Sequence, residues 1–483
     1  MTLDSRTRWL ALYVLCLGDL MIVLDGTIVN VALPSIRDDL GFSQTSLAWV
    51  VNAYLLTFGG FLLLGGRLGD LFGHRRLFLI GVSLFTAASL GCGIANSQEL
   101  LVGARAVQGV GGAIVSAVAL SLLMTLFTEQ ADRAKAMGVF GFVLSGGGVI
   151  GVLAGGVLTG LLNWHWIFLV NLPVGVLVYL LSLRLLPTAQ GPAATGRIDF
   201  AGAITVTGSL MLAVYAIING NETGWGSGQT IGLLAAAAVL LAIFLAIEAR
   251  ISSPLMPLGL FRNRNVSSAN VVGVLMAAGL FAYFFFSALY LQLVLEYTPL
   301  EVGLAYLPGT IIWGAASLLL SDRLVMRFGI KPPLLTGLAL MVLALLLLAR
   351  TPVDGNWAID ILPATIAVGI GAGIAFNPIL LAAMSGVAPD QAGLASGVVN
   401  TAFMMGGAVG LAILASLADS RHANLLASDH GSLASLNGGY HVAFLVGAAF
   451  LVASAVVTAV LLRVEAPQAH GGEMGAPATA EVD

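Results

Sequence analysis

The chain has 483 residues, of which 58% are hydrophobic and only 9% are charged, and its formal net charge is −4. Soluble domains contain about 25% charged residues, so this composition excludes an ordinary soluble protein. The apolar residues come in blocks of about 20, the length that a helix needs to cross the hydrocarbon of a bilayer. We therefore expect an all-α polytopic membrane protein.

Fourteen membrane-crossing helices are predicted from hydropathy and turn residues. In chain order the predicted spans are 9–33, 47–66, 77–96, 100–127, 136–161, 165–186, 200–220, 229–248, 267–294, 302–321, 333–350, 358–387, 393–418 and 440–462. With the N-terminus in the cytoplasm, sixteen of the 20 Lys and Arg residues fall on the cytoplasmic side and three on the other. This asymmetry follows the positive-inside rule and predicts a multi-pass protein of the cell membrane with both termini cytoplasmic.

The first span contains two carboxylates in an otherwise apolar helix, Asp19 and Asp25. A charged side chain at a helix centre in lipid costs about 2.5–3.5 kcal/mol on insertion scales. The fourth span contains Arg105, and at about 1.5 Å per residue Asp25 and Arg105 both lie roughly 9 Å below the outer boundary. We expect these two residues to face one aqueous cavity and to interact directly or through water. Asp25 is then the main proton and cation site, with Arg105 as its counter-charge.

Asp19 lies near mid-bilayer and has two interpretations. It is either a second proton-exchanging acid in the same cavity as Asp25, where each carboxylate would raise the proton affinity of the other, or a hydrogen-bond acceptor for a neighbouring helix.

A basic turn bracketed by glycines joins the second and third spans, with the sequence GGRLGDLFGHRRLFL (65–79). It is either a solvated turn that follows the positive-inside rule or a cytoplasmic gate and latch. The candidate gate residues are Gly66, Asp70, Gly73, Arg75 and Arg76. Asp70 is placed where it can face a helix N-terminus or pair with one of the two arginines.

Glycines recur every four residues in the fifth span, at Gly147, Gly151 and Gly155, with Gly156 next to the last of them. Such a strip lets another helix approach closely. It predicts either simple close packing or an interface between two parts of the protein that move against each other.

An internal repeat relates the two ends of the chain. GVFGFVLSGGGVIG (138–151) resembles GVVNTAFMMGGAVG (397–410), and GVGGA (109–113) resembles GIGAG (369–373) at nearly the same offset. The offset spans eight helices, which fits two parallel six-helix halves with two helices inserted between them. The predicted division is an N-terminal half at 1–186, two inserted helices with linkers at 187–250, a C-terminal half at 251–463 and a disordered cytoplasmic tail at 464–483.

Several of these stretches together resemble the Major Facilitator Superfamily. The turn at 65–79 is similar to the cytoplasmic signature of that family, and RAVQGVGGA (105–113) resembles the fourth-helix signature of its drug:proton antiporters. Signatures of the 14-helix branch resemble LDGTIVNVALP (24–34), WHWIFLVNLPVG (164–175) and PLMPLGLFRNR (254–264). The resemblance implies the fold of that family and proton-driven export of hydrophobic, cationic compounds by alternating access.

The expected substrate pocket is lined by polar and aromatic residues of the first, second, fourth and ninth spans. The candidates are Asn30, Asn52, Tyr54, Gln108, Tyr283 and Phe284. The stretch FAYFFFS (281–287) either lines a drug pocket, where a ring face can hold a cation, or packs against protein and lipid.

Other function classes have little support in the sequence. Neither of the two lysines belongs to a P-loop, and no H-E-x-x-H helix is present, so we expect no enzyme activity, no metal and no cofactor, with the proton motive force as the energy source. The expected partners are a small-molecule substrate, protons and the lipid bilayer, without nucleic acid, and the protein is expected to be a monomer. The alternatives are a carrier for one endogenous metabolite, such as an antibiotic or other natural product, and a membrane receptor or enzyme that transports nothing.

Overall fold

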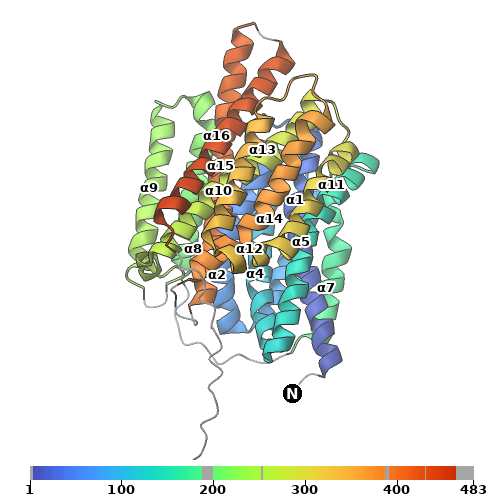
Figure 1. Ribbon diagram of the computed structural model, residues 1–483, viewed down its shortest axis with the longest axis vertical. Helices are drawn as coiled ribbons and strands as arrows, with labels where there is room; N and C mark the ends of the chain where they lie inside the picture. Colours follow the sequence, from blue (N-terminus) through green and yellow to red (C-terminus); the bar gives the residue numbers. More distant parts are fainter. Residues whose placement is uncertain are drawn as a thin grey trace, which may run out of the picture.

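The computed structural model describes residues 4–187, 199–251, 254–385, 387, 391–429 and 431–463, which form a bundle of long helices without a strand (Figure 1). The α-helices are α1 (Ser5–Leu40), α2 (Ala48–Phe72), α3 (His74–Gly93), α4 (Gln98–Leu126), α5 (Gln130–Leu161), α6 (Trp166–Leu169), α7 (Asn171–Leu185), α8 (Phe200–Thr223), α9 (Gly228–Glu248), α10 (Arg264–Leu289), α11 (Pro299–Ala316), α12 (Asp322–Phe328), α13 (Lys331–Leu348), α14 (Leu362–Met384), α15 (Ala392–Ala427) and α16 (Ser432–Leu461). The short elements are the 3-10 helix η1 (Leu258–Arg262) and the π-helical turns η2 (Tyr290–Val294), η3 (Ser317–Ser321) and η4 (Trp357–Ile361).

The helices occupy the positions that hydropathy predicts. Among the described residues, thirteen helical segments are long and apolar enough to cross a membrane. The fifth predicted span is occupied by α5, a continuous helix of 32 residues that is described in part by its backbone alone. The predicted tail at 464–483 and most of the linker before α8 lie outside the described residues.

Helix ends are set by capping groups and not by the limits of the apolar runs. The side chain of Asp4 accepts a hydrogen bond from the Thr7 amide at 3.2 Å, which caps the start of α1. The same helix continues past Pro34 and ends at Gly41, where φ is 70° and the amide donates to the Arg37 carbonyl at 2.8 Å. The predicted end at residue 33 is therefore wrong by two turns, because hydropathy reports only the apolar part of a helix.

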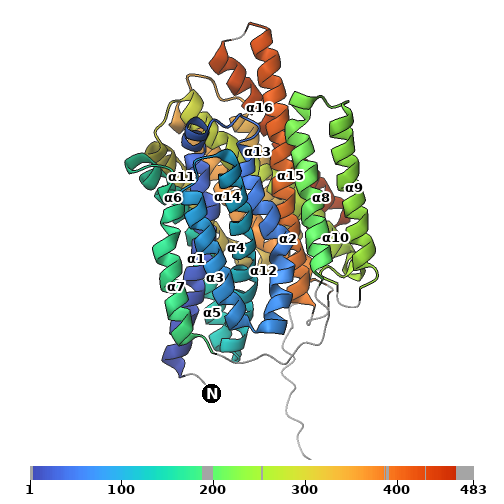
Figure 2. The same ribbon diagram turned by 180° about the vertical axis from the view of Figure 1, so that it is seen from behind.

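The last two long helices also extend beyond their predicted spans. α15 continues to Ala427 and α16 begins at Ser432, whereas the predicted boundaries were 418 and 440. In Figures 1 and 2 this helical hairpin projects beyond the rest of the bundle at the end opposite the N-terminus. We call that end the upper end and the end with the N-terminus the lower end.

The long helices pack in two groups. In the first group α1 packs against α4, α5 and α7, and α4 packs against α2 and α3. In the second group α10 packs against α14, α15 and α16, α13 packs against α14 and α16, and α11 packs against α14. The α8–α9 pair lies at one edge of the bundle, where α8 contacts α2 of the first group and α15 of the second (Figure 2).

The two groups touch closely near the upper end. The Nε2 atom of Gln292 in η2 donates a hydrogen bond to the Val31 carbonyl of α1 at 2.9 Å. A Cβ atom built on Gly156 of α5 would lie only 2.7 Å from the Pro299 carbonyl of α11, so the two backbones meet there without side chains between them. These contacts join α1 to the end of α10 and α5 to α11.

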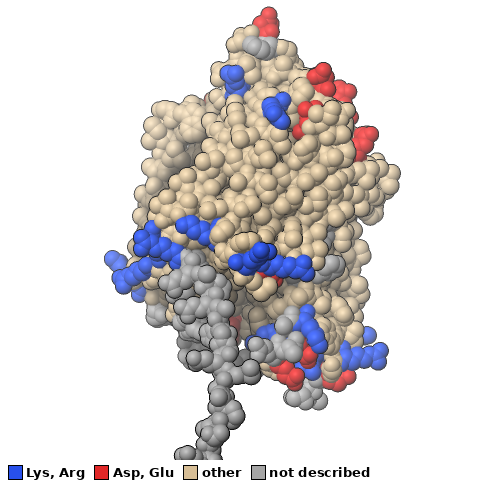
Figure 3. Space-filling view, viewed as in Figure 1, with Lys and Arg blue, Asp and Glu red and all other residues tan. Residues whose placement is uncertain are grey.

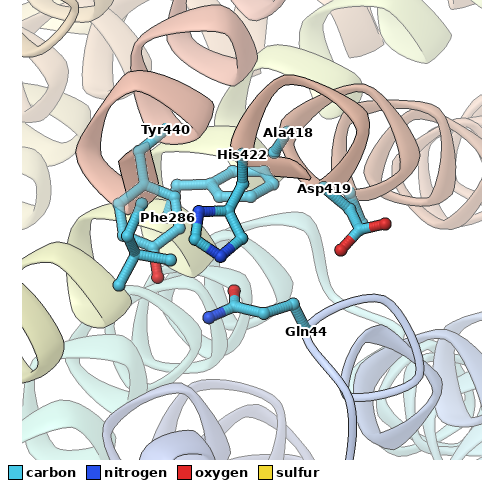
Figure 4. Close-up of a pocket in the computed structure, with 8 residues that line it drawn as sticks. Gln44, Phe286, Ala418, Asp419, His422 and Tyr440 are labelled. Atoms are coloured by element: carbon cyan, nitrogen blue, oxygen red, sulfur yellow. The ribbon is translucent and has the colours of Figure 1, made fainter. Parts of the chain in front are cut away.

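A third contact between the groups involves the loop that joins α1 and α2. Its residue Gln44 reaches a small cavity of about 10 Å³ among helices of the second group (Figure 4). The cavity is also lined by Phe286, Ala415, Ala418, Asp419, His422, Leu436 and Tyr440. A space of this size holds about one water molecule. The loop and the second group are therefore packed together at the upper end.

The surface matches a protein that lies in a bilayer. Figure 3 shows a broad middle zone without charged side chains and a gathering of Lys and Arg toward the lower end. Large apolar side chains face outward in this zone, including Leu180 on α7 and Val239 on α9, which are 54% and 58% exposed. Apolar exposure on this scale is expected where lipid replaces water as the solvent.

The glycines of α5 pack against two neighbouring helices, α1 and α11. Cβ atoms built on Gly151 and Gly155 would lie 2.0 Å from Thr27 Oγ1 and 2.7 Å from the Ile28 carbonyl, both on α1. These glycines pack inside the first group, as the close-packing interpretation predicts. Gly156 instead faces α11 of the second group, as does Gly160 one turn further along α5.

We expect Gly155→Ala to destabilise the protein by about 1–3 kcal/mol, because the added methyl group collides with the α1 backbone. Gly148 is the matched control, since nothing lies within 4 Å of a Cβ at that position. Gly148→Ala should leave stability unchanged or raise it slightly, because alanine favours the helix. Melting temperatures of the purified proteins test this, and equal effects of the two substitutions would contradict the packing of α5 on α1.

Candidate functional site

The centre of the first helix group is an ion pair between Asp25 on α1 and Arg105 on α4. The Nη1 atom of Arg105 donates a hydrogen bond to Oδ2 of Asp25, and both residues are 0% exposed. The direct interaction predicted from their shared depth is confirmed. The predicted aqueous cavity is wrong for this conformation, because both side chains are enclosed by protein.

Asp25 also receives two amide donors on its other oxygen. Oδ1 accepts from Gln108 Nε2 at 2.7 Å and from Asn171 Nδ2 at 3.1 Å. The same Gln108 nitrogen lies 2.8 Å from Ser89 Oγ on α3. Four helices, α1, α3, α4 and α7, therefore meet at one carboxylate. The roles of Asn171 and Ser89 are not among those predicted from the sequence, although Asn171 lies within the stretch at 164–175.

Arg105 is held on every side by the first group. Its Nε atom donates to the Val50 carbonyl of α2 at 2.9 Å, and its Nη1 atom donates to Gln108 Oε1 at 2.7 Å. Its guanidinium carbon lies 4.3 Å from the centre of the Tyr54 ring and 5.6 Å from that of Phe168. Aromatic faces attract a desolvated cation, so the two rings add to the stabilisation of this charge. Gln108 and Tyr54, predicted as pocket residues, line the ion pair instead.

Asp19 occupies a different environment. It is 1% exposed, and its Oδ1 atom accepts a hydrogen bond from Ser116 Oγ of α4 at 2.6 Å. Its Oδ2 atom has no hydrogen-bond partner among the described residues. Asp19 lies about 9 Å below Asp25 along α1, and the hydrogen-bond partners of the two carboxylates are different residues. Asp19 thus has one carboxyl oxygen that accepts a hydrogen bond and one that has no partner among the described residues.

The remaining pocket candidates fall into two separate places. In the first group, the Asn30 side chain bonds carbonyls of its own helix at 3.3 Å, and both amide atoms of Asn52 are buried without a partner among the described residues. In the second group, Tyr283 is buried with its ring 5.0 Å from that of the half-buried Phe284. Phe284 in turn stacks on Trp313 of α11 at 6.2 Å. No hydrogen bond or ring contact among the described residues joins these two places.

The turn between α2 and α3 forms other contacts than those predicted. Asp70 Oδ1 lies 3.2 Å from His74 Nε2, and Arg75 Nη2 donates to the Leu183 carbonyl at the end of α7 at 2.5 Å. Gly73 has φ 90°, a conformation that favours glycine. Arg75 thus ties the turn to α7, and Asp70 pairs with neither arginine. Gly66 has open space where a side chain would be.

Comparisons with known proteins agree on one family. The sequence profile of the Major Facilitator Superfamily matches residues 15–411. The puromycin resistance protein of Streptomyces alboniger is 40% identical over 484 residues, covering 98% of this chain and 95% of that protein. The cephamycin export protein of Amycolatopsis lactamdurans is 36% identical, covering 95% and 94%. The lincomycin resistance protein of Streptomyces lincolnensis is 37% identical and covers 86% of each chain.

Solved transporter structures share the fold. A bacterial homologue of the lysosomal transporter Spinster, solved in an inward-facing conformation, matches with a TM-score of 0.66 at 16% identity, covering 94% of this chain and 97% of that one. The xylose transporter XylE of E. coli matches with a TM-score of 0.61 at 15% identity, covering 94% and 97%. At these identities the likeness shows the fold alone.

We expect Asp25→Ala and Arg105→Leu each to destabilise the protein by about 3–5 kcal/mol, because each leaves a buried charge without its partner. The double variant should lose clearly less than the sum of the two. A double-mutant cycle on the free energy of unfolding or the melting temperature measures this. Additive losses would mean that the two side chains do not stabilise each other.

Proposed function

The chain belongs to the Major Facilitator Superfamily, and we propose that it exports drugs or antibiotics across the cell membrane in exchange for protons. The observation that supports this most is the buried ion pair of Asp25 and Arg105 in a multi-pass chain whose relatives are named for antibiotic resistance and export. Intramembrane ionisable residues are rare and mark ion or substrate pathways.

The orientation follows from the distribution of charge. Lys and Arg gather toward the lower end (Figure 3), and the positive-inside rule assigns that end to the cytoplasm. The upper end then faces outward, and the contacts of Gln292 with Val31 and of Gly156 with Pro299 close the outer side in this conformation. Export by alternating access requires these contacts to separate and re-form.

Protonation of Asp25 is the proposed coupling step. A proton on the carboxylate removes the negative charge that balances Arg105, which leaves the guanidinium with only carbonyl, amide and aromatic partners. The attraction between α1 and α4 then weakens, and both helices can take new positions. One charge that crosses 100 mV releases about 2.3 kcal/mol, enough for roughly a fifty-fold concentration gradient.

Asp19 is the proposed second acid. Its carboxylate has one donor, Ser116, whereas that of Asp25 has three, so a proton or an organic cation meets less competition at Asp19. The ring cluster of Phe284 and Trp313 provides an aromatic surface on the opposite group of helices. A carboxylate on one side and aromatic rings on the other can both attract a hydrophobic cation that passes between them.

Export of a single antibiotic is the second candidate function. The relatives named for puromycin, cephamycin and lincomycin favour it, because each of those names specifies one compound or one class. The two candidates share the fold and the coupling step and differ in the range of substrates.

Proton exchange is expected to depend on Asp25. In energised inverted membrane vesicles, addition of a lipophilic cation such as ethidium should trigger proton release from the lumen in the wild type and none in Asp25→Asn. Asp19→Asn should reduce the release or narrow the range of active compounds. A fluorescent probe of lumenal pH measures both effects.

The matched control is Asp38→Asn on the same helix, an exposed carboxylate that pairs with the adjacent Arg37 at 2.7 Å. It should release protons as the wild type does. Loss of release in Asp19→Asn with full activity in Asp25→Asn would move the proton site from Asp25 to Asp19. Absence of release from wild type for every cation would contradict multidrug antiport.

Substrate range separates the two candidate functions. In a drug-sensitive bacterium that lacks its own efflux pumps, expression of a multidrug exporter should raise the inhibitory concentrations of several unrelated cations at least two- to four-fold. A dedicated exporter should protect against one antibiotic class only. Phe284→Ala should weaken protection against aromatic cations more than against compounds without rings, because it removes the face that stacks on Trp313.

A further inference from the structure

A second pair of buried acids lies far along the chain from Asp25, at the lower end of the α8–α9 pair (Figure 1). Asp199 directly precedes α8, and Glu248 is the last residue of α9. The two residues are 2% and 3% exposed. Acidic residues are almost never fully buried unless they are paired, so this arrangement needs a physical reason.

Each acid uses one oxygen to hold a backbone amide. Asp199 Oδ1 accepts from the Gly202 amide at 2.7 Å and caps the start of α8. Glu248 Oε2 accepts from the Met256 amide at 3.1 Å and so fixes the segment that leads toward α10. The carboxyl groups therefore join three segments: the start of α8, the end of α9 and the start of the second helix group.

The other two oxygens, Asp199 Oδ2 and Glu248 Oε1, receive no donor from the described residues. The start of α8 and the end of α9 lie at the same end of two helices that pack against each other, so the two acids are neighbours. Two neighbouring carboxylates in a buried site cannot both remain ionised at low cost, and in other proteins such pairs hold one proton between them.

The surroundings supply no counter-charge among the described residues. α8 packs against α2 and α15. The described charged residues in the last part of α2 and directly after α9 are all exposed: Arg67, Asp70 and Arg250. No ion pair within 4 Å joins the described residues to either acid. Two further charged residues of these connections, Arg197 and Asp390, lie outside the described residues.

We propose that Asp199 and Glu248 form a proton-binding site in which one proton is shared between the two carboxyl groups. The shared proton completes a hydrogen bond between the start of α8 and the end of α9. When the proton leaves, two negative charges face each other in a buried site, and the base of the helix pair loosens.

The position of the site links the bound proton to the packing of α8 between the two helix groups. α8 packs against α2 of the first group and α15 of the second, and Ala203, one turn into α8, is buried against Leu64 of α2 and Leu255. A proton bound at the base of α8 therefore stabilises a helix that bridges the two groups. The site lies at the end that the positive-inside rule assigns to the cytoplasm, so it responds to cytoplasmic pH whichever compounds are transported.

Infrared spectroscopy of the purified full-length protein detects the proton directly, because a protonated carboxyl group has a carbonyl band that a carboxylate lacks. At pH 7 the wild type should show a buried protonated-carboxyl band that is lost in Glu248→Gln and also in Asp199→Asn. Glu222→Gln, which changes an exposed acid at the other end of α8, should keep the band. A band that is unchanged in both Asp199 and Glu248 variants overturns the proposal.

Thermal stability supplies a second test with a matched pair of variants. The native state binds the proton, so the melting temperature of the wild type should fall as pH rises through the ionisation of the pair. Glu248→Gln should keep the wild-type melting temperature at pH 7 and flatten this fall, because its amide donates to Asp199 at any pH. Glu248→Ala should lower the melting temperature throughout. If Glu248→Gln is as damaging as Glu248→Ala, Glu248 acts as an ionised carboxylate and the shared proton is refuted.

Discussion

The structure depends on one constraint: a charge inside a membrane protein must find its partners within the protein. Arg105 meets this constraint with Asp25, the Val50 carbonyl, Gln108 and the Tyr54 ring. Asp25 is on α1, Val50 and Tyr54 are on α2, and Gln108 is one turn along α4, so the pair fixes how α1, α2 and α4 are rotated. A wrong rotation would leave a buried charge at a cost of several kcal/mol.

Close backbone approach is the second requirement for this arrangement. In lipid, helices associate through packing and polar contacts and not through the hydrophobic effect. The glycines of α5 let its backbone lie against α1 at Thr27 and Ile28, next to the Asp25 site. The same helix meets α11 through Gly156, so α5 connects the interior of one helix group to the surface of the other. The groups also meet where α2 packs against α15.

The two helix groups differ in chemistry. Charged residues inside the first group lie on α1 and α4, whereas α14 has no charged residue and α10 has only Arg264, its first residue. In their place the second group has aromatic contacts, among them Phe284 with Trp313 and Phe376 with Phe403. The division separates the buried ion pair from the aromatic contacts, and the α8–α9 pair adds acids of its own at the lower end.

Sequence patterns by themselves determined the membrane class, the fourteen helical spans and the pairing of Asp25 with Arg105. The apolar spans follow from the cost of exposing polar groups to lipid. Two opposite charges at the same depth predict an ion pair, because either charge alone would be costly there. Helix ends were predicted less well, because capping groups such as Asp4 and Gly41 decide them.

Tertiary structure alone decided which helix each side chain faces. The sequence could not show that Asn171 on α7 and Ser89 on α3 complete the Asp25 site, because residues so far apart meet only when the helices pack. It could not separate Asp19 from Asp25, since the rotation of α1 decides which neighbours each carboxylate has. The proximity of Asp199 and Glu248 was hidden for the same reason: each is an ordinary acid at a helix end until two helices bring them together.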